Sequence, residues 1–374
     1  DNTVLYKGYD LFHLPEKMLP LHQWKNFGSI PFIDYHPGHG VFDMLPHGAY
    51  YLLNGGNPLE SLVWGNGYFI GWTVQTLYIG LLFAFLARVF ESTTAFFLLW
   101  LLPVFHVLDP YNSLLLLPLL NLLTLPSSAR PQLRWHLQWL LTLALALWRA
   151  DFGMIVVAGN LITAAALTWH QGSWRSLVRC LASMAIVSLL LLLGALATAP
   201  EIIAERLARS RDLMQIQLLA ASYDHFYKEW NQQAWAQYVL MPVLGALAGG
   251  YALARVYLRQ DRQLLGIHLV IIFATAIGFA LSIRLFQRHS LVEGVTKTNF
   301  FYLAPLLLLA TLRYTRSWQG PVAVCLVIAT FLLTPKAVKY REESPWSPRQ
   351  SYPVTTHPTE FPELAGPEPR LQDL

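Results

Sequence analysis

Residues 181–199 read LASMAIVSLLLLLGALATA, a run of nineteen positions without a charged side chain. A helix of about 20 such residues is long enough to cross the roughly 30 Å hydrocarbon core of a bilayer. Similar runs recur along the chain, and ten candidate spans can be drawn with rough edges: 68–88, 94–108, 113–126, 136–149, 152–170, 179–199, 238–257, 264–284, 299–314 and 320–334. The sequence therefore predicts an all-α polytopic membrane protein with about ten transmembrane helices.

The composition of the whole chain agrees with this class. Of its 374 residues, 55% are hydrophobic and 13% are charged, whereas an ordinary soluble domain carries about 25% charged residues. These values exclude a disordered chain, a collagen-like repeat and a disulfide scaffold. Cys180 and Cys325 both lie in apolar runs, so we expect them to be small core residues. Gly249-Gly250 is interpreted as a close contact between helices.

Three zones divide the chain. Residues 1–67 are rich in His, Asp, Pro, Gly and aromatic residues, residues 68–334 hold the apolar runs, and residues 335–374 contain eight prolines. We expect an extracytoplasmic first loop with short interfacial helices, then a transmembrane domain, then an extended tail. Within the second zone, residues 200–237 combine apolar, charged and aromatic side chains in a pattern typical of a helix that lies in the outer membrane interface.

The placement of arginine predicts the orientation of the chain in the membrane. If residues 1–67 lie outside, the inside loops receive ten arginines and only two acidic residues, Glu91 and Asp261. The arginines are Arg88, Arg130, Arg134, Arg175, Arg179, Arg255, Arg259, Arg262, Arg313 and Arg316. This excess is what the positive-inside bias requires. Because the chain starts at Asp1 and no apolar span precedes Trp64, we also expect that an N-terminal transmembrane segment is missing.

The first fifty residues concentrate groups that can carry chemistry. They hold five of the 12 histidines and five acidic residues. Most of these fall in two phrases: Asp10-Leu-Phe-His13-Leu-Pro-Glu16, and Gly28-Ser-Ile-Pro31-Phe-Ile-Asp34-Tyr-His36-Pro-Gly-His39-Gly. An acid beside Pro and Gly is, taken alone, more often a helix cap or a turn former. The dense interleaving of acid, histidine, proline and glycine favours a functional loop.

Two further phrases place charges at the outer ends of apolar runs. Arg149 and Asp151 lie in Leu147-Trp-Arg149-Ala-Asp151-Phe-Gly153, at a tight turn between two spans. A structural role, as a mutual ion pair or a snorkelling arginine, and a functional role, as contacts to a sugar or phosphate, are equally favoured. Arg284, Arg288 and His289 make a late outside loop basic, against the usual charge bias. Binding of phosphate or pyrophosphate is the preferred interpretation, ahead of plain contact with lipid headgroups.

The order of these features resembles a known group of enzymes. An acid-rich first loop, the pattern G-x-I-P-x-x-D-x-x-x-x-H-G and many spans are similar to GT-C membrane glycosyltransferases of the family 39 and aminoarabinose-transferase kind. Arg149-Ala-Asp151-Phe-Gly153 is similar to an Arg-x-Asp-x-Gly turn of bacterial members. The resemblance implies a multi-pass protein of a prokaryotic plasma membrane. Its active face would be extracytoplasmic, where sugar passes from a polyprenyl-phosphate donor to a glycan, lipid or protein acceptor.

The resemblance also places the catalytic carboxylate in the first outside loop, which Asp34 or Asp10 would supply. Transfer needs a base for the acceptor's proton and positive charge for the departing phosphate. We prefer Asp34 as the base of an inverting reaction, because its phrase is the more specific. The expected substrate-binding residues are His13, Glu16, His36, His39, Arg149, Asp151, Arg284, Arg288 and His289.

A metal site is an alternative use of the same residues. His36-Pro-Gly-His39 with His13 or His47 would supply imidazole ligands, but the Pro-Gly turn makes substrate-contacting histidines the favoured interpretation. No cofactor is certain, and a divalent ion held by Asp34 and Asp109 remains an open alternative. Besides donor and acceptor, the expected partners are membrane lipids; nucleic acid is not expected for a net charge of +4.

Two other functions fit a polytopic chain. A lipid-linked glycan transporter or flippase would place ionisable groups at mid-span and often shows repeated halves. Here the span centres are almost free of charge and no internal repeat is found. A ligase or polymerase that uses a lipid-diphosphate donor would rely on the late basic loops, and the carboxylates of the first loop count against it. An enzyme acting at the outer surface is therefore favoured.

Overall fold

The computed structural model describes residues 22–23, 25–28, 48–51, 53, 73, 75–104, 114–148, 150–198, 239–259, 262–285 and 303–311. The described residues are mostly helical and contain no strand, so the all-α fold class is confirmed for this part of the chain. The elements are α4 (Gln75–Val89), α5 (Ser92–Val104), α6 (Leu116–Thr124), α7 (Pro131–Trp148), α8 (Ala150–Gln171), α9 (Arg175–Thr198), α12 (Met241–Tyr257), η5 (Arg262–Leu264), α13 (Leu265–Leu285) and a helical segment over 303–311.

These helices overlap nine of the ten apolar spans predicted from the sequence, and the tenth, 320–334, lies outside the described residues. Within the described part of the chain, one helical stretch, Arg175–Gly194 of α9, is long and apolar enough to cross a membrane. Thr76–Val89 and Leu265–Ala280 are shorter apolar helices. The interfacial helix expected over 200–237 and the extended tail also lie outside the described residues.

The edges of the helices depart from the predicted edges where polar residues join the first turns. α7 begins at Pro131 rather than at 136. Proline suits the first turn of a helix because its missing N–H would have no partner there. Gln132, Arg134 and His136 then occupy the first turns, where hydropathy alone gives no signal. The apolar pattern thus located the helix but missed its polar start.

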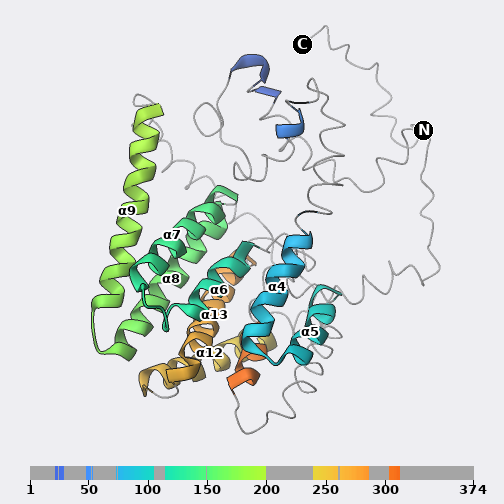
Figure 1. The fold of residues 1–374 in the computed structure, drawn as a ribbon, viewed down its shortest axis with the longest axis vertical. Coiled ribbons are helices and arrows are strands. Elements are labelled where there is room, and N and C mark those ends of the chain that lie inside the picture. Colours follow the sequence, from blue (N-terminus) through green and yellow to red (C-terminus); the bar gives the residue numbers. More distant parts are fainter. Residues whose placement is uncertain are drawn as a thin grey trace, which may run out of the picture.

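α13 lies at the centre of the bundle, with α6, α8 and α12 packed against it (Figure 1). It is apolar on all sides, and a helix of that kind is stable only when it is surrounded. Residues 269–274 are each at most 3% exposed. Glycines allow the neighbours to approach closely. At Gly159 of α8, a Cβ atom would lie 2.8 Å from Cε2 of Phe273.

The predicted contact at Gly249-Gly250 is confirmed for one of the two glycines. A Cβ atom on Gly249 would lie 2.7 Å from Cγ2 of Thr275 in α13, whereas one on Gly250 would meet nothing within 4 Å. Adjacent positions on a helix point about 100° apart, so only one of the pair can face the neighbour. Cys180 is fully buried, as expected, and Cys325 lies outside the described residues.

The helices run alternately up and down, so that several of their ends meet. The ring Nδ1 of His170 donates a hydrogen bond to the carbonyl of Val256 (3.1 Å), which joins the last turns of α8 and α12. Gln132 of α7 donates to the hydroxyl of Ser183 in α9 (3.1 Å). The α8–α9 and α4–α5 turns lie at the lower end of the bundle in Figure 1. We call it the basic end, because the helix ends and turns that meet there include Arg88, Arg130, Arg134, Arg175, Arg179, Arg255 and Arg259.

A chain of buried hydrogen bonds joins α6, α7 and α8. Asn121 donates to Gln138 Oε1 (2.8 Å), and Gln138 Nε2 donates to Asn160 Oδ1 (2.8 Å). Asn160 Nδ2 then donates to the hydroxyl of Thr142 (2.8 Å), which donates to the carbonyl of Gln138 (2.7 Å). All four side chains are at most 4% exposed. We call them the polar network; its members supply one another with partners, as polar groups between packed helices require.

Candidate functional site

Most of the residues predicted to act on substrate lie outside the described residues. They are Asp10, His13, Glu16, Asp34, His36, His39, Arg149, Arg288 and His289. The backbones of the other two are described. Asp151 lies in the first turn of α8, and Arg284 lies in the last turn of α13. The structure therefore shows where the backbones of Asp151 and Arg284 lie in the bundle.

The packing of α8 against α13 brings the two positions to the same end of the bundle. Gly159 of α8 faces Phe273 and Ile277 of α13, and the two helices run in opposite directions. Asp151 precedes Gly159 by about two turns, or about 12 Å, and Arg284 follows Ile277 by about two turns. Both backbones are thus at a similar height, at the end of the bundle opposite the basic end.

Gly153, the glycine of the Arg149-Ala-Asp151-Phe-Gly153 phrase, has a packing role. A Cβ atom on it would lie 2.6 Å from Cα of Ala146 in α7 and would also collide with the Cβ of that alanine. Only glycine lets α7 and α8 approach this closely just after their turn. This contact fixes the start of α8, and with it the backbone position of Asp151.

Two described segments flank the Asp34 phrase. The hydroxyl of Tyr51 lies 3.3 Å from Nδ1 of His22, and the Tyr51 side chain is only 2% exposed. The ammonium of Lys25 lies 5.0 Å from the centroid of the Tyr51 ring, a cation–π contact. The segments before and after residues 29–47 therefore touch, which brings together the two ends of the stretch that contains Asp34.

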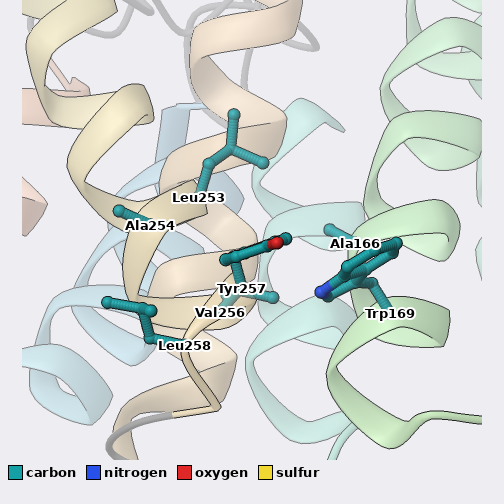
Figure 2. Close-up of a pocket in the computed structure, with 7 residues that line it drawn as sticks. All are labelled: Ala166, Trp169, Leu253, Ala254, Val256, Tyr257 and Leu258. Atoms are coloured by element: carbon teal, nitrogen blue, oxygen red, sulfur yellow. The ribbon is translucent and has the colours of Figure 1, made fainter.

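A groove at the basic end was not anticipated from the sequence. It has a volume of about 450 Å³, within the range of roughly 300–1,000 Å³ of ligand sites, and lies between α8 and α12 (Figure 2). The rings of Trp169 and Tyr257 stack across it, with centroids 5.0 Å apart and planes 16° apart. The remaining lining is aliphatic: Ala166, Leu253, Ala254, Val256 and Leu258.

Arg259 borders this groove in an unusual backbone conformation. Its φ of 54° is in the left-handed region, where glycine is the common residue after a helix end. Its Nη2 donates to the carbonyl of Trp169 (3.4 Å). Gly172, with φ of 61°, follows the end of α8 and has no side chain to block the guanidinium, since a Cβ there would lie 2.8 Å from Nη2.

The end of α8 itself is closed by backbone hydrogen bonds. The N–H of Gly172 donates to the carbonyl of Trp169 (3.1 Å), and the N–H of Ser173 donates to the carbonyl of Thr168 (3.3 Å). This pair of bonds is a Schellman motif, which satisfies carbonyls that the helix leaves open. The bond from Arg259 is therefore an addition to a helix end that is already capped.

His268 is a buried polar side chain between α12 and α13. It is fully buried, and neither ring nitrogen has a hydrogen-bond partner. The edge of its ring meets Tyr251, with centroids 6.3 Å apart, and Arg255 lies 5.9 Å from the Tyr251 centroid. In the described ranges, no group of three or more His, Cys, Asp or Glu residues is placed to hold a metal ion. The candidate ligands Asp34, Asp109 and His47 lie outside these ranges.

No protein-family model, no curated protein and no solved structure matches this chain.

Proposed function

We propose that this chain is a multi-pass membrane glycosyltransferase of the GT-C kind. It transfers a sugar, with inversion, from a polyprenyl-phosphate donor to an extracytoplasmic glycan, lipid or protein. The observation that carries the proposal is the antiparallel register of α8 and α13. In that register the backbones of Asp151 and Arg284 lie at a similar height, toward the end of the bundle opposite the basic end. By the positive-inside bias, this is the outer end, where a lipid-linked donor presents its headgroup.

The apolar exterior of the helices supports the membrane part of the proposal. Leu189, Leu190, Leu191, Leu192 and Leu193 of α9 are 45–62% exposed. Five consecutive exposed leucines would be a costly surface in water, and contact with lipid tails removes that cost. Exposed apolar side chains also occur on α4, α5, α7 and α12, so we extend the proposal from α9 to about ten spans with ends inside and outside.

The proposed chemistry assigns one role to each charge. The carboxylate of Asp34 removes the proton from an acceptor hydroxyl or amine as that group attacks the anomeric carbon of the donor sugar. The bond from that carbon to the phosphate oxygen breaks on the opposite face, and polyprenyl phosphate leaves with the electron pair. Arg284, Arg288 and His289 stabilise the negative charge on the departing phosphate. Asp10 is the alternative base.

An enzyme at one surface fits the described charges better than a transporter does. A transporter would place ionisable groups at mid-span. Among the described residues the acidic ones are Glu91 and Asp151, and both lie at helix ends. The polar network crosses the middle of α8, but its side chains are neutral and bond to one another. These groups hold helices together and do not form a path for a charged substrate.

The test is transfer of radiolabelled sugar from polyprenyl-phosphate donors in membranes that contain the full-length gene product. We expect Asp34→Asn to abolish transfer while insertion in the membrane and donor binding remain. Asp43→Asn, an acid of the same segment without an assigned role, is the matched control and should remain active. Arg284→Gln should raise the donor KM about tenfold or more, because a hydrogen bond to a charged group is worth about 1.5–3 kcal/mol.

Several outcomes would contradict this mechanism. Loss of transfer in Asp10→Asn but not in Asp34→Asn would move the base to Asp10. If the wild type transfers nothing from any monophosphate donor, or if both variants equal the wild type, the proposed reaction is wrong. Transport of a lipid-linked glycan, or ligation from a lipid diphosphate, would then be the leading function.

A further inference from the structure

We infer that the groove between α8 and α12 binds an anionic phospholipid of the cytoplasmic leaflet. One acyl chain would lie against Trp169 and Tyr257, and the phosphate would lie at Arg259. The inference rests on the membrane orientation given under Proposed function, but not on glycosyl transfer. It assigns a binding site at the end of the bundle opposite the proposed reaction.

The lining of the groove is suited to a hydrocarbon chain. Aliphatic side chains form most of the lining, together with the two stacked rings. Trp169 is 55% exposed and Tyr257 is 59% exposed, so both present apolar surface that a chain would cover (Figure 2). Tryptophan and tyrosine are also the side chains enriched at the level of the lipid headgroups. A polar solute would find few partners here.

The conformation of Arg259 points to a role beyond the fold. A non-glycine residue in the left-handed region is disfavoured, and glycine would fit the position without strain. The single bond to Trp169 O (3.4 Å) is long, and α8 is already closed by the bonds of Gly172 and Ser173. The side chain is exposed, and a guanidinium has five N–H donors, so most of them remain available for a phosphate.

The charges around the groove favour an anionic headgroup over a zwitterionic one. Besides Arg259, Arg175 and Arg179 lie in the first turns of α9, which follow the end of α8 directly. The described acid at the basic end is Glu91, in the turn between α4 and α5. Charge complementarity at this level of a membrane selects anionic lipids. The apolar lining suits an acyl chain and the basic residues suit a phosphate. Together they favour a phospholipid over a free anion.

The experiment measures lipid retention on the purified full-length protein by native mass spectrometry. Phosphatidylglycerol and phosphatidylcholine with identical acyl chains are added in a neutral detergent. We expect the wild type to retain phosphatidylglycerol preferentially. Arg259→Gly should reduce this preference about fivefold, as expected for one basic residue at a membrane surface, without lowering the thermal unfolding midpoint. Glycerol phosphate should not compete, because it lacks the acyl chain.

Two pairs of variants separate the groove from the general surface. Ala254→Trp places a large side chain from an exposed position into the groove and should reduce retention of phosphatidylglycerol. Leu190→Trp, on the exposed face of α9, is its control and should leave retention unchanged. Arg88→Gln, an exposed arginine in the last turn of α4 at the same end, is the control for Arg259→Gly and should change the preference less than twofold.

The inference is overturned if the wild type shows no preference between the two lipids, or if Arg88→Gln acts as strongly as Arg259→Gly. It is also overturned if Arg259→Gly lowers the unfolding midpoint and leaves lipid retention unchanged, since Arg259 would then only join α12 to α8. Asp34→Asn should retain phosphatidylglycerol as the wild type does. If the wild type prefers phosphatidylglycerol but transfers no sugar, the lipid site is supported and the proposed glycosyltransferase function is contradicted.

Discussion

Gly249 and Gly250 are neighbours in α12 with opposite environments, and they give a matched test of the packing. Gly249→Ala would drive a Cβ atom against Thr275 of α13, so we expect a loss of about 1–3 kcal/mol of unfolding free energy. Gly250→Ala meets open space and should be neutral or stabilise by up to about 1 kcal/mol. Denaturation of the two variants in detergent measures the difference. Equal effects would contradict the α12–α13 register described above.

Single residues also show what can and cannot be predicted from sequence. Burial of Cys180 follows from its place in an apolar run. The packing role of Gly153 does not, because it depends on Ala146 of a different helix. The conformation of Arg259 is also hidden, since the residue looks like any basic loop residue after a span. Both the packing role of Gly153 and the conformation of Arg259 depend on contacts between helices, which the local sequence pattern does not show.

At the scale of the helices, the polar network is the feature most open to test. Asn160→Ala would leave Gln138 Nε2 without its acceptor and Thr142 Oγ1 without its donor. We expect a loss of about 1–3 kcal/mol of unfolding free energy, the usual cost of a buried polar group without a partner. Unfolding in detergent, monitored by circular dichroism, measures it.

A double-mutant cycle provides the control for this prediction. Gln138→Leu with Asn160→Leu removes both partners together, so the double variant should lose less stability than the sum of the two single variants. Additive losses would show that the two side chains do not interact across α7 and α8.

The existence of the helices was predictable from sequence, but the network that joins them was not. Long apolar runs located α8, α9 and α13 to within a few residues, because a helix that is apolar all round has few alternatives. Gln138 and Thr142 interrupt the apolar run of α7 at a spacing of four, which puts them on one face. That spacing is the signal that could have indicated a buried polar contact with α8.

At the scale of the whole molecule, the proposed orientation depends on which helix ends lie together. The positive-inside bias grouped ten arginines on one side, and seven of them belong to helix ends and turns that meet at one end of the bundle. This grouping was possible from sequence because consecutive spans joined by short loops must alternate between the two sides of the membrane. It could not align Asp151 with Arg284, because the depth at which α8 packs on α13 depends on Gly159 and Phe273. The proposed catalytic acids Asp34 and Asp10 remain predictions from sequence alone.

The proposed orientation makes a direct prediction about accessibility. In a chain with Cys180→Ser and Cys325→Ser, we expect Thr3→Cys to react with a membrane-impermeant maleimide in intact spheroplasts of the expression host. Ser127→Cys, in the exposed turn between α6 and α7, should react only after lysis, because it lies at the basic end. The reverse labelling pattern would show that the protein has the opposite orientation, with Asp34 on the inner face of the membrane. Reaction of both cysteines in intact spheroplasts would mean that the bundle does not separate the two positions by a membrane, and the glycosyltransferase proposal would lose its premise.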